Sequence, residues 1–299
     1  MTITNPGVYD AIPFAIYHGD LCDGPSVSAS TLVALENRCP AYAWARHYLH
    51  PAPVEQEDTD ATAFGTAAHA YIVEGPAAFG ARYLLKPRGM NFATKAGKEW
   101  REAHADKGTI ITAEDFEAIR AMARAVADHP AARHAFAGGK PEQTLAFRDT
   151  ETCLWLKARP DYLKQNLALN YKTTINGKRE AWERQAWGLG YHMGAALCVD
   201  VMRGCGIDGP LYGFVVQEKE APYTPVVRVL DDAVIEWGRL QYRAALRTFA
   251  ACLASGKWPG YSAEVERVGL PAWAEVGLQK RHERGEFTAE INPNILAAG

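Results

Sequence analysis

Several features that would settle the class of this protein at once are missing from its 299 residues. No apolar run approaches the roughly 18 to 20 residues that a membrane-spanning helix needs, and the start MTITNPGVYD lacks the basic and apolar segments of a secretion signal. The six cysteines form no CxxC pair and no spacing typical of zinc or iron–sulfur sites. Low-complexity tracts and internal repeats are also missing. These absences predict a soluble, cytoplasmic protein without a membrane partner.

The chain also has no large excess of positive or negative charge. The chain has 32 Lys and Arg against 35 Asp and Glu, a net charge of −3, so any nucleic-acid partner must be held by a local patch. One basic stretch exists, with a single acid, and its members are Arg82, Lys86, Arg88, Lys95, Lys98 and Arg101. The plain interpretation is a solvated face. We favour an arch that contacts DNA phosphates, which would give affinity without sequence reading.

What remains is the composition of an ordinary globular protein. Apolar residues make up 48% and charged residues 22% of the chain, which excludes disordered, collagen-like and coiled-coil classes. The length fits one large domain or two smaller ones. We expect a single domain over 1–262, with a helical part at 26–135 and a core of strands and helices at 140–255, followed by an extension at 263–299.

Helix signals dominate the first half of the chain. They predict a helical entry at 26–50 and a helix over FGTAAHAYIVE at 64–74, whose small residues, beginning with Gly65, allow close approach to another backbone. A capping box predicts a further helix from residue 112 to about 129. Residues 82–108 show no periodic pattern, and we expect them to be irregular.

The second half of the chain mixes strand and helix signals. We expect three β-like runs forming a meander, a long helix, a strand, an edge strand and a last helix, at 142–148, 153–163, 167–173, 183–202, 211–217, 226–230 and 231–255. This order predicts a mixed α/β core.

The segment RPDYLKQNLALNYKTT carries the most chemistry. Pro160-Asp161 ends one β-like run, and Asn170 and Lys172 lie on one face of the next, because side chains alternate along a strand. If the two runs form a hairpin, an acid, an amide and a lysine meet. A carboxylate cluster holds Mg²⁺, and a nearby lysine can orient or help deprotonate an attacking water. The plain alternatives are a turn residue for Asp161 and an edge-strand gatekeeper for Lys172.

These motifs resemble the PD-(D/E)xK nuclease superfamily, and within it the RecE-type phage and prophage exonucleases, with RecB-like and lambda exonuclease relatives further away. The likeness rests on four segments in order: SASTLVALENRCPAYAW, FGTAAHAYIVEG, KARPDYL…LNYKTT, and GFVVQEKEAPY followed by a helix and WPGY. The segments span roughly residues 28–261. The resemblance implies an α/β restriction-endonuclease-like core, a central mixed β-sheet flanked by helices, with an N-terminal helical elaboration.

The resemblance also implies roles for single residues. His69 matches the histidine of the GTxxH helix and Asp161 the PD aspartate, both metal ligands, while Lys172 matches the catalytic lysine. Glu142 looks like the additional acid that such cores bring to the metals, and the backbone carbonyl of Tyr171 is a further ligand. The plain alternatives are a core histidine and a solvated glutamate.

Three more residues complete the predicted DNA-binding set: Arg159, Tyr191 and Gln217. The relatives carry a QxxxY motif on the helix after the site, but Gln185 and Tyr191 are six residues apart here, so we carry only Tyr191 over. Gln217 lies where the family strand passes the site, although a strand-end polar cluster explains it equally well.

Asn170 departs from the family pattern, which has Asp or Glu at this position. Its amide oxygen is neutral and a weaker ligand than a carboxylate for a hard divalent ion. The loss of one transition-state stabiliser typically costs about 10²- to 10³-fold in rate. Asn170 therefore predicts an impaired enzyme, as in an engineered Asp-to-Asn variant or a naturally inactive homologue.

Taken with the resemblance, these residues imply a Mg²⁺-dependent exonuclease, with Mn²⁺ as a substitute, that degrades linear double-stranded DNA from an end. The family implies a 5′-to-3′ direction, 3′ single strands for recombination, a single-strand annealing protein as partner, a homo-oligomeric ring and a bacterial or phage origin. Two rivals remain open. One is a catalytically inactive module that binds DNA ends, and the other is the nuclease subunit of a helicase complex.

Overall fold

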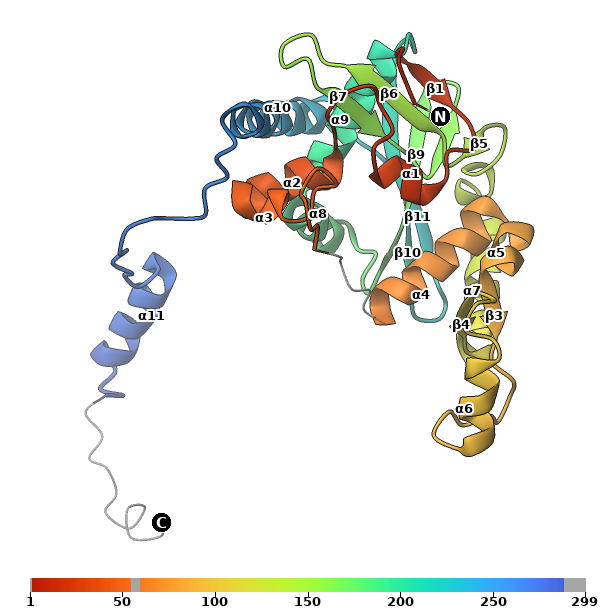
Figure 1. Cartoon of the computed structure of the whole chain (residues 1–299). Helices are drawn as coiled ribbons and strands as arrows, with labels where there is room; N and C mark the ends of the chain where they lie inside the picture. The colour runs from red at the N-terminus through yellow and green to blue at the C-terminus, as the bar shows by residue number, and fades with distance from the viewer. Residues whose placement is uncertain (1, 55–59, 288–299) are drawn as a thin grey trace. The chain divides into compact units, whose positions relative to one another are not determined.

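The computed structural model of the chain describes residues 2–54 and 60–287 (Figure 1). The chain divides into two compact units, Met1–Gly260 and Tyr261–Gly299. The last part of the predicted extension, 288–299, and a short stretch of the predicted helical part, 55–59, lie outside the described residues. No helix in the described ranges is long and apolar enough to cross a membrane.

The first unit contains both helices and strands, with the strands β5 to β9 following one another in its middle. Its helices are α1 (Phe14–His18), α2 (Ala29–Asn37), α3 (Pro40–Trp44), α4 (Asp60–His69), α5 (Pro76–Arg82), α6 (Lys95–Glu102), α7 (Ala113–Asp128), α8 (Arg179–Gly188), α9 (Tyr191–Gly204) and α10 (Asp232–Ser255). A π-helical turn (Ala70–Glu74) continues α4, and a 3-10 turn (Ala132–His134) follows α7. The second unit contains α11 (Ala272–Glu283).

The strands form two larger mixed sheets and a small one. They are β1 (Gly7–Tyr9), β2 (Ser26–Ser28), β3 (Tyr83–Leu85), β4 (Thr109–Ile111), β5 (Lys140–Pro141), β6 (Thr144–Arg148), β7 (Trp155–Ala158), β8 (Tyr162–Lys164), β9 (Leu167–Thr174), β10 (Leu211–Glu218) and β11 (Pro225–Val229). The orders are β11-β10-β9-β8-β5, β1-β6-β7-β2 and β3-β4. In the first, β9 and β10 run parallel and the other pairs antiparallel. The predicted α/β class, a mixed β-sheet flanked by helices with a helical N-terminal part, is confirmed, except that two larger sheets stand where we expected one central sheet.

The predicted single meander is wrong. β6 and β7 pair within the four-stranded sheet, whereas β8 and β9 pair within the five-stranded one. The chain leaves the first sheet at Arg159 and Pro160, and proline, which has no backbone N–H to donate, ends the ladder there. Asp161 therefore lies at the junction of the two sheets.

The predicted long helix 183–202 is also wrong, because α8 and α9 are separate helices. Gly190 between them has φ +69°, a left-handed conformation that glycine adopts without strain. A Cβ at Gly190 would lie 2.7 Å from Val33 Cγ1 of α2. The close approach of α2 thus fixes the point at which the chain turns into α9.

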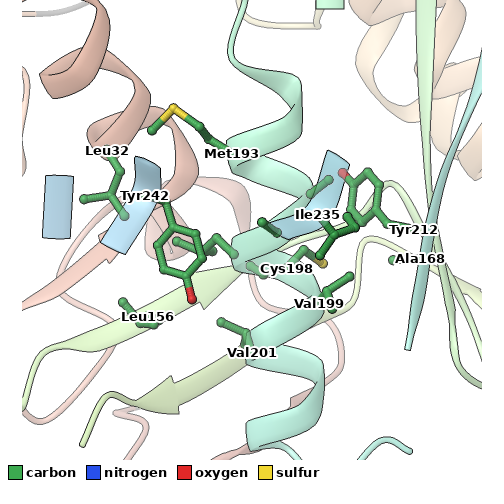
Figure 2. Packing of buried hydrophobic residues seen from close by; sticks show 14 of the residues in the cluster. Leu32, Leu156, Ala168, Met193, Cys198, Val199, Val201, Tyr212, Ile235 and Tyr242 are labelled. Atoms are coloured by element: carbon green, nitrogen blue, oxygen red, sulfur yellow. The ribbon is translucent and has the colours of Figure 1, made fainter. Parts of the chain in front are cut away.

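The core gathers around α9, which is apolar on nearly all sides because sheets and helices enclose it. Figure 2 shows Met193, Cys198 and Val201 of this helix packed among side chains from α2, β7 and α10, including Leu32 and Tyr242. The helix crosses α10 at Gly238, where a Cβ would lie 2.2 Å from the backbone oxygen of His192.

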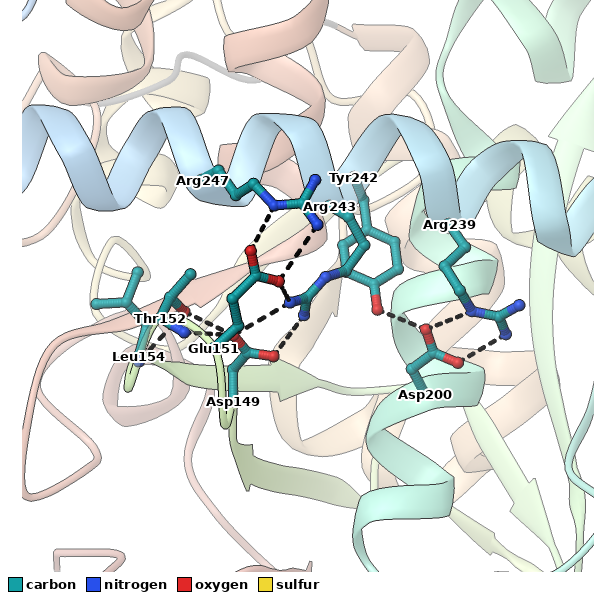
Figure 3. Close-up of polar contacts among 9 residues, drawn as sticks. All are labelled: Asp149, Glu151, Thr152, Leu154, Asp200, Arg239, Tyr242, Arg243 and Arg247. Carbon is teal, nitrogen blue, oxygen red and sulfur yellow. Dashed lines mark hydrogen bonds and ion pairs between the residues drawn. The ribbon is translucent and has the colours of Figure 1, made fainter.

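Ion pairs join α10 to α9 and to the residues after β6, as Figure 3 shows. Arg243 contacts Asp149 beside β6. Earlier on the helix, Arg239 Nη2 lies 2.7 Å from Asp200 Oδ1 of α9, and the Tyr242 hydroxyl donates to Asp200 Oδ2 at 2.5 Å. The charge of each carboxylate is thus balanced by a guanidinium, and we interpret the cluster as structural.

Residues 83–111 form an arm of their own, and the expectation that 82–108 is irregular is wrong. β3 and β4 pair at its base, and α6 follows the cap residue Thr94, whose hydroxyl accepts from the N–H of Gly97. Gly97 packs so closely that a Cβ would lie 2.0 Å from Asn91 O. In Figure 1, α6 lies beyond β3 and β4, away from the two large sheets.

Candidate metal centre

His69 stands at the end of α4, which lies against strand β9. The contact depends on small residues, as predicted: a Cβ at Gly65 would lie 3.2 Å from Thr173 Oγ1 of β9, and Ala67, Ala68 and Ala70 are buried. The last helical residue is thereby brought next to the strand that carries Asn170 and Lys172.

Asp161 lies one residue before β8, in the predicted hairpin. Because Tyr162 pairs with Leu169, the aspartate faces the next positions of β9. The N–H of Tyr171 donates to Asp161 Oδ2 at 2.7 Å, and Lys172 Nζ lies 3.8 Å from the same oxygen. The N–H of Asp161 donates weakly to Asn170 Oδ1, at 3.4 Å. The acid, amide and lysine therefore meet.

Glu142 occupies the turn between β5 and β6, where its backbone adopts the left-handed φ of +55°. Its N–H donates to the carbonyl of Asp161 at 3.1 Å, which links the turn to the hairpin. Arg159 Nε donates to Glu142 Oε2 at 2.7 Å. The other carboxylate oxygen, Oε1, points toward His69.

These elements bring three potential ligands together. His69 Nε2 lies 3.3 Å from Glu142 Oε1 and 3.5 Å from Asp161 Oδ2, and one ligand atom of each residue lies within 4.8 Å of the others. Within the described residues the buried Nε2 has no partner with hydrogen-bond geometry, although both carboxylates are close. An unpaired imidazole nitrogen facing two carboxylate oxygens fits a divalent metal ion.

The charges of the cluster shift its pKa values strongly. Burial alone would lower the pKa of His69, but the carboxylates of Asp161, Glu74 and Glu142 outweigh it and raise that pKa to about 10. Burial opposes ionisation of Asp161, yet Lys172 and His69 hold its pKa below the ordinary range. Burial raises the pKa of Glu142. Without a metal, a proton on His69 offsets the negative charge of this pocket.

A cleft of about 1560 Å³ opens over the cluster. Its walls include His69, Glu142, Asp161, Asn170 and Lys172. Such a cleft is wide enough to admit more than a small ligand.

Tyr191 also lines this cleft, with Lys172 Nζ 5.9 Å from the centre of its ring. The break at Gly190 places the tyrosine there, at the first turn of α9. Gln185 does not join it, since its Oε1 accepts from the hydroxyl of Thr174 at 2.9 Å and the residue is not part of the cleft wall.

The predicted DNA-contacting residues fall into three groups. Arg82 and Arg159 line the cleft, where each forms an ion pair with a glutamate. The other members of the basic stretch lie on the arm, outside the cleft wall: Lys86, Arg88, Lys95, Lys98 and Arg101. The prediction for Gln217 is wrong. Its side chain is fully buried, accepts from the Tyr171 hydroxyl, and donates to the carbonyls of Met122 and Tyr223.

Sequence reasoning missed Glu74. Its Oε1 lies 3.4 Å from His69 Nδ1, on the side of the ring that faces away from Asp161, and its pKa is lowered because His69 and Arg82 outweigh the effect of burial. The residue was visible at the end of FGTAAHAYIVE, but a spacing of five does not place two residues on one face of an α-helix.

The two-sheet fold and this set of donors define a protein of the PD-(D/E)xK nuclease-like class, whose members generally use divalent metals. The chain belongs to the family described as PDDEXK-like domain of unknown function (DUF3799), whose model matches residues 28–270. The superfamily resemblance drawn from the sequence is thereby confirmed.

A solved structure adds to the assignment of the fold. A crystal structure described as that of a "Putative exonuclease" from Eubacterium rectale superposes on this chain with a TM-score of 0.55 and 9% sequence identity. The match covers 87% of this chain and 94% of the chain in that structure. At this identity the likeness concerns the fold alone. No protein with a curated description matches the sequence.

Proposed function

We propose that the protein is a Mg²⁺-dependent exodeoxyribonuclease that degrades linear double-stranded DNA from an end. One observation carries the proposal: His69, Glu142 and Asp161 converge on one point of a large cleft, with the Lys172 ammonium beside them. A metal-dependent phosphodiesterase needs this combination of ligands and a nearby cation. Mn²⁺, which also accepts imidazole and carboxylate ligands, should replace Mg²⁺.

His69, Glu142 and Asp161 would hold the metal, with Asn170 and the Tyr171 carbonyl as weaker oxygen donors. The bound ion would lower the pKa of water and neutralise charge on the phosphate. Two neighbouring groups of the chain hold and complement the Asp161 carboxylate. The N–H of Tyr171 fixes the Asp161 carboxylate. Lys172 Nζ lies 3.8 Å from Oδ2 of that carboxylate, where it can donate to an attacking water or to a phosphate oxygen.

Cations of the cleft and arm support DNA as the substrate. Arg82 and Arg159 line the cleft beside the ring of Tyr191, and the arm carries the remaining basic residues of the predicted set. Contacts of this kind bind phosphates regardless of sequence, which suits an enzyme that degrades any duplex. The resemblance to RecE-type enzymes adds the 5′-to-3′ direction and the 3′ single-stranded product.

The same resemblance supports partners for this activity. A single-strand annealing protein would take up the product strand, and a homo-oligomeric ring would place the arm cations of several copies around one DNA molecule. Because the net charge of the chain is −3, DNA binding needs basic residues that are concentrated in one place.

One observation favours a second function. Asn170 stands where the superfamily has an acid, so the pocket has one negative charge fewer. A chain that binds DNA ends without cutting them would keep the cleft and the arm but tolerate this loss. The test compares the present sequence with Asn170→Asp on a linear duplex in the presence of Mg²⁺.

We expect Asn170→Asp to raise the cleavage rate by about 10²- to 10³-fold, because it restores a carboxylate that contacts the metal and stabilises the transition state. Release of nucleotides from end-labelled duplex measures it, and Asp161→Asn in the same background should abolish the gain. If Asn170→Asp cuts no faster and neither protein binds Mg²⁺, the binding function is correct. Cleavage that requires an added helicase would identify a helicase-complex subunit.

A further inference from the structure

We propose that Glu74, held by Arg82, is a positioning residue for the imidazole of His69. This inference rests on the metal-dependent function proposed above and describes a second layer of contacts behind the ligands. It starts from a local irregularity of the backbone. Helix α4 ends at His69, and the following residues, Ala70–Glu74, form a π-helical turn.

The π-helical turn decides where Glu74 points. In an α-helix, with 3.6 residues per turn, a residue five positions after His69 faces about 140° away from it. A π-helix closes its hydrogen bonds between residues five apart and so brings these positions to one side. Single π-helical turns are rare and occur frequently at functional sites. Here Glu74 Oε1 comes within 3.4 Å of His69 Nδ1.

Arg82 contacts the same carboxylate oxygen of Glu74. Its Nη2 lies 2.7 Å from Glu74 Oε1, and its Nε donates to the carbonyl of Ala78 at 3.2 Å. The backbone of Arg82 is itself fixed, because Gly108 crosses it so closely that a Cβ there would lie 2.5 Å from Arg82 O. Glu74 is only 17% exposed, so its charge acts with little screening by water.

The consequence concerns the two nitrogens of the His69 ring. A carboxylate at Nδ1 accepts the N–H on that side, which leaves Nε2 to face Glu142 and Asp161. Histidines that bind metals almost always donate their other N–H to a carboxylate, carbonyl or water, which fixes the ring and raises its basicity as a ligand. The series Arg82, Glu74, His69 has this connectivity.

The decisive variant is Glu74→Gln, which keeps the shape of the side chain and removes its charge. We expect Mn²⁺, measured by isothermal titration calorimetry, to bind about 10- to 100-fold more weakly, with the melting temperature changed by no more than about 3 °C. Arg82→Gln should weaken binding by up to about five-fold, because the guanidinium is half exposed. The matched control, Glu117→Gln, breaks an ion pair with Arg120 on α7 and should leave Mn²⁺ affinity unchanged.

A second measurement tests the positioning without metal. In ¹⁵N-labelled histidine spectra of the metal-free protein, the Nδ1–H proton of His69 should exchange slowly in the unsubstituted protein and rapidly in Glu74→Ala. His104, whose Nδ1 lies 2.7 Å from the accepting carbonyl of Trp100, serves as the internal reference. Its signal should be the same in both proteins.

The outcomes separate the two proposals. If the unsubstituted protein binds no Mn²⁺, the metal-dependent function fails, and the exchange measurement still decides whether Glu74 orients the ring. If Mn²⁺ binds the unsubstituted protein and Glu74→Gln equally well, or if the His69 proton stays protected in Glu74→Ala, the positioning role is overturned while the metal-dependent function stands.

Discussion

At the scale of single residues, His69 decides the charge balance of the pocket. Its ring lies among the carboxylates of Glu74, Glu142 and Asp161, and together they raise its pKa to about 10 despite its burial. At neutral pH the metal-free protein therefore carries an imidazolium in this place. A metal ligand must be the neutral ring, so an incoming ion has to displace a proton.

The raised pKa of His69 predicts that the stability of the metal-free protein depends on pH. The pKa of His69 rises from about 6.5 in the unfolded chain to about 10 in the folded one, so its stabilising effect is fully present below about pH 6.5 and is lost as the pH rises through 10. In urea unfolding with EDTA, His69→Gln should therefore destabilise the protein strongly at pH 6 and little at pH 10. A difference that does not vary with pH would contradict this. With saturating Mg²⁺, the unsubstituted protein should release about one proton per ion bound at pH 7.

Single residues also show how far sequence reasoning reaches. Asp161, Asn170 and Lys172 could be placed together because strand alternation and a hairpin leave little freedom. Gln217 was misplaced because a glutamine near the end of a strand looks the same whether its amide faces a cleft or completes buried hydrogen bonds. Glu74 was missed because only a π-helical turn, which has no sequence signature of its own, brings it to His69.

At the scale of elements, helix and strand types were predicted better than their breaks and partners. The capping box at Thr112 marks the start of α7, as expected, with its hydroxyl accepting from the N–H of Asp115. The break at Gly190 depends on the side chain of Val33, far away in sequence. After β7 the chain passes from the four-stranded sheet to the five-stranded one, and this depends on which neighbouring strand each segment pairs with. Such contacts between distant segments are not encoded in local periodicity.

The arm carries the element-scale prediction. Replacing Lys95, Lys98 and Arg101 of α6 with glutamine should weaken binding to duplex DNA and lower the slope of log Kd against log salt by up to about three, since each lost phosphate contact removes about 0.9. Fluorescence anisotropy over a series of salt concentrations measures the slope. Cleavage of a short duplex at low salt should continue, because the metal pocket is untouched.

A matched variant controls for charge alone. Arg203→Gln, Arg247→Gln and Lys257→Gln together remove the same charge from α9, α10 and the residues after α10, outside the cleft wall. An equal loss of slope in this control would mean that the arm has no special part in DNA binding.

At the scale of the whole molecule, the boundary after Gly260 is anchored in the first unit. Trp258 stacks on Trp44 with ring centres 4.4 Å apart, and the N–H of Ala41 donates to the carbonyl of Pro259 at 3.0 Å. In the second unit, α11 has no buried residue, and Val265 is 98% exposed. The first unit thus contains its own complete core.

A truncation after Gly260 should therefore keep the melting temperature within about 2 °C of the full chain and keep Mn²⁺ affinity unchanged. A truncation after Gly256, only slightly shorter, removes Trp258 and should lower the melting temperature by at least about 4 °C, because it exposes Trp44 and Phe249. Differential scanning calorimetry distinguishes the two. Equal melting temperatures for both truncations would show that the aromatic stack adds nothing to the fold.

The backbone of Glu142 is held in a strained conformation. A left-handed φ strains any residue with a β-carbon by about 1–2 kcal/mol, and glycine would relieve that strain. Glycine would also leave the Arg159 guanidinium without its acidic partner and take one oxygen donor from the pocket. Leaving this nearly buried guanidinium unpaired costs about 3–5 kcal/mol, more than the strain that glycine would relieve, so folding alone already favours the acid at this turn.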